Sequence, residues 1–489
     1  MLGAMIRRFA SRVAALLSVV AVAAALSALA LVAARCGNDP ARAWRGMNVI
    51  WISFDSVRAD HCSFEGYARD TTPGLAAVAG RGVRFSRSIA QAPYTLPSYA
   101  SMLTSRYVAQ LAVQEQRDEK DQAKILGIAP GPSENDALIS EALRGAGYRT
   151  AAFVQSWISK PLGFDQGWDV FRHRQETLKD KMPEVLRFVE DNREKKFFVF
   201  LYTTDTHYPF LHAHKREYLY GKYPSDFDFT LDAIHRVREG KLRPSADDIA
   251  NAMALYDEGL HWADADLAPL FELLRKTGLA EKTILVFNAD HGEEFDEHGV
   301  ISHGQTYYDG VVRTPLVIAA PKTPAAGTAV SELVQNLDIA PTLLDMVGVE
   351  RPPGWSGRSL AWALAGKPSP AAAAPPPAFS EGAWTFWIGS VQQAENKFIL
   401  VTPQDRMLFD LASDPHETKN LAMEEAGRDS VRTLYHVLMK HLGGPAAQVA
   451  SGGTGTPSYE TWMKQVMGHY GLTEESDVVK ELRSLGYLK

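Results

Sequence analysis

The sequence predicts an α/β fold in which helices flank a large, mostly parallel or mixed β-sheet, followed by a smaller C-terminal α+β subdomain. Wholly apolar segments of strand length recur at residues 47–54, 196–202 and 283–288. Such segments are typical of strands that are buried on both faces of a sheet. Segments with helical periodicity separate them, and this alternation favours a parallel sheet covered by helices. A Pro/Ala-rich stretch at residues 367–378 then divides this pattern from shorter alternating segments.

The length and composition indicate an ordinary globular protein. The chain has 489 residues, which is enough for one large core and a satellite. Hydrophobic residues make up 46% and charged residues 22% of the chain, a balance typical of folded domains. The net charge of -7, without a basic stripe, argues against a nucleic-acid partner. The two cysteines, Cys36 and Cys62, predict no disulfide framework.

The N-terminal segment, residues 1–46, predicts a membrane anchor. Arg7, Arg8 and Arg12 precede an uncharged run at residues 13–34. A transmembrane helix needs about 20 apolar residues, and this run reaches that length. We therefore expect a membrane-anchored protein whose main body lies outside the cytoplasm, in the periplasm. A cleaved signal peptide, which would leave the protein secreted, is the alternative.

The main domain, residues 47–366, is expected to alternate strands and helices. After the strand at 47–54 come a short helix at 72–79, with Pro73 in its first turn, and a strand at 83–89. Residues 108–133 are polar and Gln-rich and predict an irregular surface excursion. The remaining strands are expected at 149–155, 196–202, 283–288 and 315–319, and the remaining helices at 133–143, 178–192, 247–274 and 337–347. Beyond the linker, residues 379–424 predict short strands and residues 425–489 a polar, partly helical tail.

The stretch 92–105, which reads APYTLPSYASMLTS, contains the candidate nucleophile Thr95. Pro93 and Pro97 mark a turn, and the apolar-periodic run after them places Thr95 or Ser98 at or next to a helix N-terminus. The free backbone N–H groups and the helix dipole favour an anion there, either an alkoxide or a phosphate oxygen. The alternative is that Thr95 only caps the helix, as Ser and Thr residues commonly do.

Residues of metal-ligand type follow three of the apolar strands. Asp55 follows the first strand, Asp205 and His207 follow the second, and Asp290 and His291 follow the third. In an open α/β sheet, the site lies off the carboxyl ends of the strands. These side chains can therefore converge although they are far apart in the sequence.

Residues 288–304, NADHGEEFDEHGVISHG, form the stretch that is densest in candidate ligands. Asp290, His291 and His303 supply oxygen and nitrogen donors that suit a divalent transition metal. The acidic run at residues 293–297 is interpreted as a solvated loop, which is the usual setting of a charge run. The segment therefore predicts a divalent-metal site with Asp290, His291 and His303 as candidate ligands.

These segments together resemble the sulfatase branch of the alkaline phosphatase superfamily. Residues 54–107, which begin FDSVRADH and end LPSYASMLTSRY, are similar to the family's metal-ligand strand and the nucleophile helix after it. The stretch NADHGEEFDEHGVISHG resembles the second metal motif, and RTPLVI the strand after it. LFDLASDPHETKNLA, residues 408–422, resembles the C-terminal signature. The resemblance runs from Asn48 to Ala422 in the family's order.

The sequence departs from the sulfatase pattern at the positions that determine the chemistry. A sulfatase carries a C-x-P-x-R element whose Cys or Ser matures to formylglycine, and the matching residues here are Thr95, Pro97 and Tyr99. The family's paired aspartates are here Asp55 and Ser56. Its Asp-Asn metal pair is here Asp290-His291. The aldehyde precursor, the arginine beside it and one carboxylate are thus missing.

With these departures, the site resembles that of phosphoethanolamine transferases and lipoteichoic acid synthases, which are anchored members of the same superfamily with a threonine nucleophile. The resemblance implies that Asp55, Thr95, Asp290 and His291 hold the main metal. An imidazole ligand and fewer carboxylates favour zinc or manganese over calcium, and a second metal stays open. His207 and His303 would bind the phosphate group, a second metal or the leaving-group proton, with Asp205 orienting His207. Arg58 and Lys322 are interpreted as solvated charges.

The leading functional hypothesis is a metal-dependent hydrolase or transferase that acts on phosphate mono- or diesters through a covalent Thr95 intermediate. A threonine sulfate ester has no gem-diol route for eliminating sulfate, whereas a threonine phosphate ester is open to in-line attack at phosphorus. The first alternative is a sulfuric ester hydrolase without formylglycine. The second is an inactive family member that acts as a binding module. The expected substrate is an anionic ester, and the anchor suggests an envelope lipid or glycan.

Overall fold

A computed structural model gives the structure of residues 43–442, with the exception of 118–124, 211–216, 223–224, 226, 228, 239, 372–374, 383–387 and 402–404. The expected membrane anchor at 13–34 and most of the expected polar tail lie outside the described residues. Among the helices that the structure does describe, none has the length and apolar character that a bilayer crossing requires.

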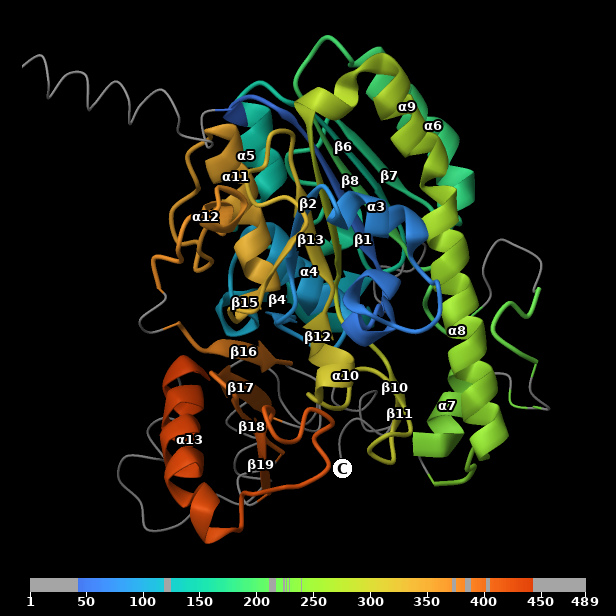
Figure 1. The fold of residues 1–489 in the computed structure, drawn as a ribbon, viewed down its shortest axis with the longest axis vertical. Coiled ribbons are helices and arrows are strands. Elements are labelled where there is room, and N and C mark those ends of the chain that lie inside the picture. Colours follow the sequence, from blue (N-terminus) through green and yellow to red (C-terminus); the bar gives the residue numbers. More distant parts are fainter. Residues whose placement is uncertain are drawn as a thin grey trace, which may run out of the picture.

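An eight-stranded mixed sheet forms the centre of the structure (Figure 1). Its central strand, β1 (Asn48–Phe54), pairs in parallel with β8 (Phe197–Thr203) on one side and with β9 (Thr283–Ala289) on the other. The order across the sheet is β14-β2-β13-β9-β1-β8-β6-β7. The outer strands are β2 (Gly82–Phe85), β6 (Arg149–Val154), β7 (Val170–His173), β13 (Leu316–Ala319), which is antiparallel, and β14 (Thr328–Val330).

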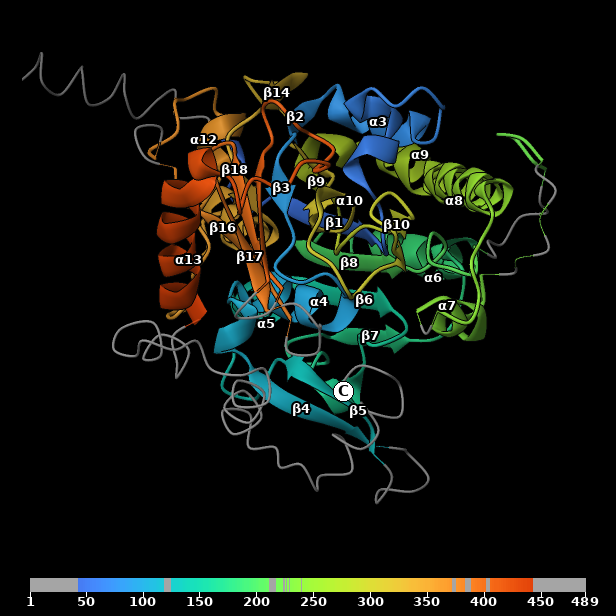
Figure 2. The same cartoon turned by 90° about the horizontal axis from the view of Figure 1, so that it is seen from below.

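Helices cover both faces of this sheet, which confirms the predicted fold class (Figure 2). Successive β1 side chains alternate between two cores, so that Val49 and Trp51 join one core while Ile50 and Ile52 join the other. The first core also includes α4 (Thr95–Thr104), α5 (Ile139–Gly145), α11 (Ile339–Val347) and α12 (Ala361–Leu364). The second includes α3 (Pro73–Ala79), α6 (Leu178–Asp191), α8 (Ala246–Asp266) and α9 (Ala268–Thr277).

The C-terminal subdomain is an antiparallel sheet covered by one helix, as the α+β prediction requires. Its strands are β16 (Ala378–Glu381), β17 (Gly389–Gln393), β18 (Asn396–Leu400) and β19 (Arg406–Asp410). The helix α13 (Arg428–Leu442) packs on this sheet through Leu434 and Leu438. α10 (Asp309–Val312) lies between the subdomain and the central sheet, and the hairpin of β10 (Glu294–Phe295) and β11 (Ile301–Ser302) lies beside it, next to α7 (Leu231–Arg238) and α8 (Figure 1).

Three local predictions were wrong. Residues 108–133 are not irregular, because β4 (Ala112–Arg117) and β5 (Ile125–Gly131) pair as an antiparallel hairpin. The strand expected at 83–89 is split between β2 and β3 (Ser88–Ile89), which joins a second small sheet with β12 (Arg313–Thr314) and β15 (Val334–Gln335). The helix expected at 247–274 is divided at Leu267, because Pro269 in the first turn of α9 cannot donate a backbone hydrogen bond to α8. A further helix, α7 (Leu231–Arg238), was not predicted.

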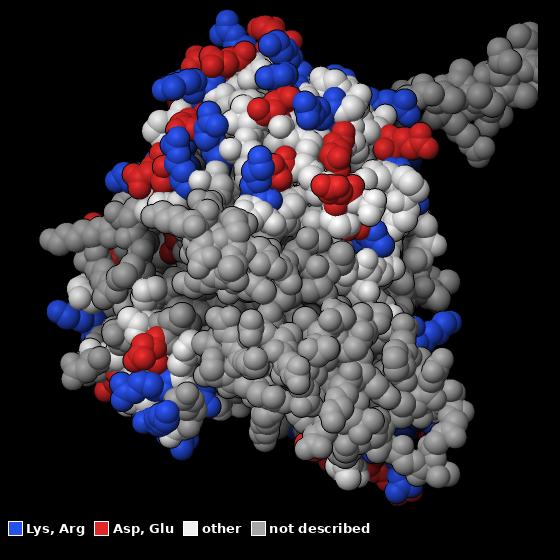
Figure 3. Space-filling model, turned by 180° about the vertical axis from the view of Figure 1, so that it is seen from behind, with Lys and Arg blue, Asp and Glu red and all other residues white. Residues whose placement is uncertain are grey.

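Charged side chains are mixed on the back face of the molecule. Over the described residues of that face, lysines and arginines alternate with acidic side chains (Figure 3). Opposite charges at short spacing cancel within about 10 Å at 0.1 M salt. That face therefore produces no extended field of one sign over its described residues.

A buried lysine joins the C-terminal subdomain to the rest of the protein. Lys397 of β18 lies 2.7 Å from Asp309 Oδ1, at the start of α10, and 2.8 Å from Glu417 Oε1. Its side chain is 1% exposed. Burial alone would lower the pKa of Lys397, but the two carboxylates raise it above its ordinary value. The lysine is therefore charged, and it compensates a buried and a partly buried acid at once.

Replacing Lys397 by methionine is expected to destabilise the protein by about 3–5 kcal/mol, because a buried and a partly buried carboxylate lose their partner. Burial raises the pKa of Asp309, but Lys397 and Arg313 bring it below its ordinary value. Asp309 therefore stays ionised at pH 4, and its ion pair with Lys397 is lost only at lower pH. Burial raises the pKa of Glu417 to about 7, so this second carboxyl is ionised at pH 8 and protonated at pH 4. Urea unfolding at pH 8 and at pH 4 should give a larger loss at pH 8.

A lysine-to-methionine change at an exposed ion pair is the matched control. Lys419 lies 3.3 Å from Glu424 Oε1, with 66% and 44% of the two side chains exposed. Because water screens this pair, Lys419→Met should change the free energy of unfolding by less than about 1 kcal/mol at either pH. If Lys397→Met lowered the free energy of unfolding by as little as Lys419→Met, the structural role of Lys397 between the subdomain and the rest of the protein would be wrong.

Candidate metal centre

The candidate site is at the carboxyl ends of the two central strands β1 and β9. These strands are parallel and in register, with Phe54 opposite Ala289. The residues that follow them, Asp55 and Asp290, therefore emerge side by side, and His291 comes next. All three side chains are at most 1% exposed.

Asp55, Asp290 and His291 form a cluster with the dimensions of a metal site. They offer one ligand atom each, and these atoms lie within 4.8 Å of one another. His291 Nε2 is 3.6 Å from Asp55 Oδ1 and 3.4 Å from Asp290 Oδ2. Two carboxylates and one imidazole are a donor set that zinc or manganese accepts.

The protonation of His291 directs a lone pair into this cluster. Its Nδ1 lies 2.9 Å from the carbonyl oxygen of Gly292, so Nδ1 carries the proton and donates it there. Burial lowers the pKa of His291 to about 4, although Asp55 raises it in part. The imidazole is therefore neutral, and Nε2 faces the two carboxylates as an electron-pair donor.

The two carboxylates lack the positive charge that their burial requires. Asp290 Oδ1 accepts hydrogen bonds from the backbone N–H groups of Ser56, at 3.1 Å, and His291, at 2.9 Å. Its Oδ2 has no hydrogen-bond partner among the described residues. Burial, and then the charge of Asp55, raise the pKa of Asp290 well above its ordinary value. A cation between these oxygens would remove the cost of burying them, so the residues present fit a divalent metal.

Thr95 is the first residue of α4 and points toward this cluster. Its Oγ1 lies 3.3 Å from His291 Nε2. The N-cap position of α4 belongs to Tyr94, and no side-chain cap bond is made there. Ser98 Oγ fixes the helix by donating to the carbonyl oxygen of Asp290, at 2.6 Å. The geometry therefore favours the site position of Thr95 over the capping alternative.

His303 and His207 lie on the other side of His291. The ring centroid of His303 is 4.3 Å from that of His291 and 5.0 Å from that of His207. His303 Nδ1 is 3.1 Å from Glu293 Oε1. Burial lowers the pKa of His303 and raises the pKa of Glu293, so the pair is neutral and shares one proton. The histidine thereby has a proton available beside the cluster.

Asp205 does not have the role that was expected for it. Its Oδ2 accepts a hydrogen bond from the backbone N–H of Leu178, at 2.9 Å, and so caps α6. His207 instead has its Nδ1 2.6 Å from the carbonyl oxygen of Tyr208. A backbone carbonyl, not a carboxylate, thus orients His207.

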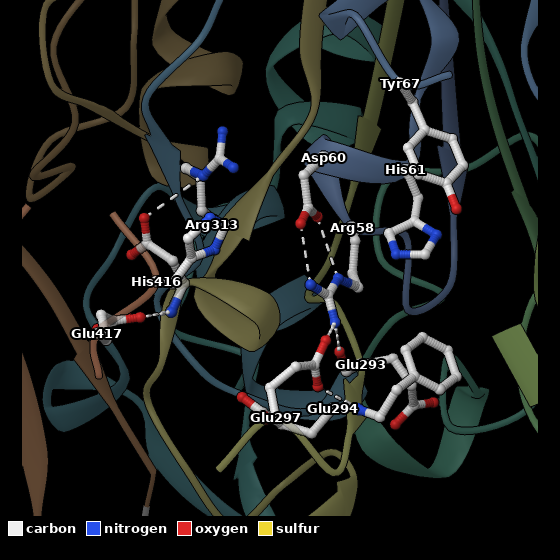
Figure 4. A network of polar contacts seen from close by, with 12 residues as sticks. Arg58, Asp60, His61, Tyr67, Glu293, Glu294, Glu297, Arg313, His416 and Glu417 are labelled. Atoms are coloured by element: carbon white, nitrogen blue, oxygen red, sulfur yellow. Dashed lines mark hydrogen bonds and ion pairs between the residues drawn. The ribbon is translucent and has the colours of Figure 1, made fainter. Parts of the chain in front are cut away.

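The first part of the acidic run at 293–297 is buried rather than solvated, whereas Asp296 and Glu297 are exposed as expected. Arg58 is not a solvated charge (Figure 4). Glu293 and Glu294 are each 1% exposed. Arg58 is 7% exposed, forms two hydrogen bonds with Asp60, and also donates to Glu293 O, at 3.1 Å, and to Glu297 Oε1. Lys322, in contrast, is exposed as expected.

Gly292, directly before this run, is the residue of the sequence that could have indicated the burial. A Cβ added to Gly292 would lie 2.1 Å from the carbonyl oxygen of Gly310. The loop after β9 therefore presses directly against α10, which only a glycine allows. This contact holds the start of the loop, with Glu293 and Glu294, inside the protein.

Two buried tyrosines near the cluster gave no signal in the sequence. Tyr202 of β8 donates its hydroxyl to Asp55 Oδ2. Tyr99 of α4 shares a hydrogen bond with Ser53 Oγ, at 2.8 Å. Ser56 has a positive φ of 59° and donates Oγ–H to Asp55 Oδ1, at 2.7 Å. These contacts fix the carboxylate of Asp55 from both sides.

The sequence and the fold of this chain are similar to those of known proteins. The family model described as "Sulfatase" matches residues 47–349. The arylsulfatase K of Mus musculus is 32% identical over 187 residues, which cover 36% of this chain and 34% of that protein. The chain thus spans about a third of the length of this relative. The N-acetylglucosamine-6-O-sulfatase of Bacteroides thetaiotaomicron is 23% identical over 426 residues, covering 68% of this chain and 73% of that protein.

Solved structures share the same fold at low identity. A putative sulfatase from Bacteroides thetaiotaomicron has a TM-score of 0.67 at 19% identity, covering 81% of this chain and 92% of that chain. The phosphonate monoester hydrolase of Agrobacterium radiobacter has a TM-score of 0.62 at 18% identity, covering 81% of this chain and 95% of that chain. At these identities the likeness shows the fold alone.

Proposed function

The chain belongs to the sulfatase family of hydrolases, and we propose that it cleaves or transfers phosphate esters through a covalent Thr95 intermediate in a metal-dependent reaction. The observation that carries this proposal is the position of Thr95 Oγ1, 3.3 Å from His291 Nε2 at the edge of the Asp55, Asp290 and His291 cluster. A hydroxyl at a helix N-terminus beside a cation site is placed to act as a nucleophile.

Asp55, Thr95, Asp290 and His291 would hold the divalent cation, with zinc or manganese preferred over calcium. When bound, the cation would stabilise charge on the ester oxygens and lower the pKa of the Thr95 hydroxyl. Thr95 releases its hydroxyl proton to water, and its Oγ forms a bond to phosphorus in line with the bond that breaks. His303, through the proton that it shares with Glu293, protonates the leaving oxygen.

The second half of the reaction reverses these roles. A water molecule, or the hydroxyl of an acceptor, attacks phosphorus and gives its proton to His303. The bond between phosphorus and Thr95 Oγ breaks, and this oxygen takes a proton back from water, which returns the threonine to its starting state. Water gives hydrolysis and an alcohol gives transfer, so one site accommodates both outcomes.

Sulfate ester hydrolysis is the second candidate. It is favoured by the names of the relatives, among them the N-acetylglucosamine-6-O-sulfatase, which covers 68% of this chain. It is disfavoured by Thr95 at the position of the formylglycine precursor and by Tyr99 at that of its arginine. A binding module without activity is a third candidate, which predicts no bound metal in the purified protein.

We propose in addition that residues 13–34 anchor the protein and place the domain outside the cytoplasm, next to an envelope lipid or glycan substrate. The uncharged run behind three arginines supports this. Alkaline carbonate extraction of membranes tests it. The full-length protein should stay in the membrane pellet, and its release into the soluble fraction would contradict the anchor.

A panel of aryl esters tests the reaction. The full-length protein, purified in detergent and loaded with zinc or with manganese, is assayed on an aryl phosphate monoester, phosphodiester, phosphonate monoester and sulfate. Turnover of a phosphate ester at least about a hundredfold faster than that of the sulfate is expected. Preferred turnover of the sulfate would refute the phosphate proposal in favour of the second candidate.

A further inference from the structure

Two tyrosines lie side by side beneath the candidate metal centre and differ in one contact. Tyr99 and Tyr202 are both fully buried, and their ring centroids are 4.7 Å apart in an edge-to-face arrangement. The Tyr202 hydroxyl donates to Asp55 Oδ2, whereas the Tyr99 hydroxyl shares its hydrogen bond with Ser53 Oγ. Only Tyr202 therefore contacts a candidate ligand with its polar group.

The backbone of Asp55 is fixed independently of these tyrosines. Its N–H donates to the carbonyl oxygen of Thr203, at 3.0 Å, and its carbonyl oxygen accepts from Thr206 Oγ1. The freedom that remains is rotation of the carboxylate about its side-chain bonds. The hydrogen bonds to the two carboxylate oxygens therefore determine which oxygen faces the cluster.

The two oxygens of Asp55 have different surroundings. Oδ1 accepts from Ser56 Oγ, at 2.7 Å, and is the oxygen that lies 3.6 Å from His291 Nε2. Oδ2 faces β8, where it accepts the hydrogen bond of the Tyr202 hydroxyl. The tyrosine thus holds the outer oxygen and leaves the inner oxygen toward His291.

We propose that Tyr202 is a positioning residue that sets the Asp55 carboxylate for one-oxygen binding of the metal. This inference rests on the proposed metal-dependent function. A residue that hydrogen-bonds a ligand carboxylate fixes its orientation, and its loss typically weakens metal affinity by 10–100-fold. Without the Tyr202 hydroxyl, the carboxylate rotates more freely. Metal binding must then order it, and this entropy cost weakens the metal affinity.

The matched pair Tyr202→Phe and Tyr99→Phe tests this proposal. Each variant keeps its buried ring and removes one buried hydroxyl. Zinc dissociation constants of the full-length protein are measured by competition with a chromophoric chelator. Tyr202→Phe should raise the dissociation constant by about 10–100-fold, and Tyr99→Phe by less than about threefold.

Thermal unfolding of the metal-free variants separates positioning from general stability. Because each variant loses one buried hydrogen bond, both should lower the melting temperature by similar amounts. The added stability that zinc gives should fall only in Tyr202→Phe. This readout distinguishes the proposal from a purely structural role of the tyrosine, which would lower both melting temperatures and leave zinc affinity unchanged.

Failure of this inference is distinguishable from failure of the proposed function. Unchanged zinc affinity in Tyr202→Phe, with one zinc still bound by the native protein, would overturn the inference and leave the metal-dependent function standing. Equal losses of affinity in the two variants would also overturn it. A native protein that binds neither zinc nor manganese would refute the metal site itself, and the inference with it.

Discussion

The Thr95→Ala variant is expected to lose phosphate-ester turnover by at least about a thousandfold, because it removes the atom that forms the covalent bond to phosphorus. The loss should appear in kcat, since the three other proposed metal ligands, Asp55, Asp290 and His291, are unchanged. Thr95→Ser keeps a hydroxyl at the helix N-terminus and is the matched control, expected within about tenfold of the native rate.

A trapped intermediate makes the same prediction testable without kinetics. Acid quenching during turnover, followed by peptide mass spectrometry, should find phosphate on the peptide that contains Thr95 in the native protein. Thr95→Ala should give no such peptide while still binding metal. If the alanine variant kept turnover within about tenfold of the native protein, a water molecule would be the nucleophile and the covalent route would be wrong.

Asp290→Asn is expected to have opposite effects on the metal-free and the metal-bound protein. In the metal-free protein, burial and Asp55 raise the pKa of Asp290. A carboxyl whose pKa rises on folding costs stability above its ordinary pKa of about 4, and the cost grows as the pH increases toward the raised pKa. The neutral amide removes this cost, so the metal-free melting temperature should rise at pH 7.

The same substitution should weaken zinc binding by at least about a hundredfold, because the site loses one of its two carboxylate charges. Calorimetric melting with and without zinc measures both effects in one experiment. The control is Asp264→Asn, since Asp264 is a buried carboxylate that accepts from the N–H groups of Gly74 and Leu75, both at 2.7 Å. Burial also raises the pKa of Asp264, to about 6, but both of its oxygens accept hydrogen bonds, and an amide NH2 cannot replace one of them. That variant should therefore not raise the metal-free melting temperature, and it should leave the zinc-induced shift unchanged. If Asp264→Asn reduced the zinc-induced shift and Asp290→Asn did not, the proposed metal centre would be wrong.

The sheet could be predicted from the sequence because its central strands are marked locally. β1, β8 and β9 are predominantly apolar and are followed by polar residues, so their bounds were predicted to within one residue. Their parallel register then brings Asp55 next to Asp290 without further information. The family resemblance is confirmed by the match over residues 47–349. The roles of Thr95, His207 and His303 stay predictions.

What could not be predicted depends on contacts between distant segments. Glu293 was taken for a solvated side chain because a charge run usually is solvated, and only the packing of Gly292 on Gly310 reverses this. Tyr202 stands in an apolar strand and reads as core, yet its hydroxyl reaches Asp55, 147 positions earlier in the chain. The pairing of β4 with β5 has no apolar alternation to mark it.

The contact between α10 and the loop after β9 has a consequence for the order in which the protein becomes active during synthesis. The backbone N–H groups of Gly292 and Glu293 donate to Val311 O and Gly310 O, at 2.7 and 3.0 Å. The start of α10 is in turn held by Lys397 and Glu417, which leave the ribosome about a hundred residues after His291. A nascent chain that ends before the C-terminal subdomain therefore contains every candidate ligand, but its metal loop lacks the support of the finished fold. We expect ester turnover to begin only once translation has passed Glu417.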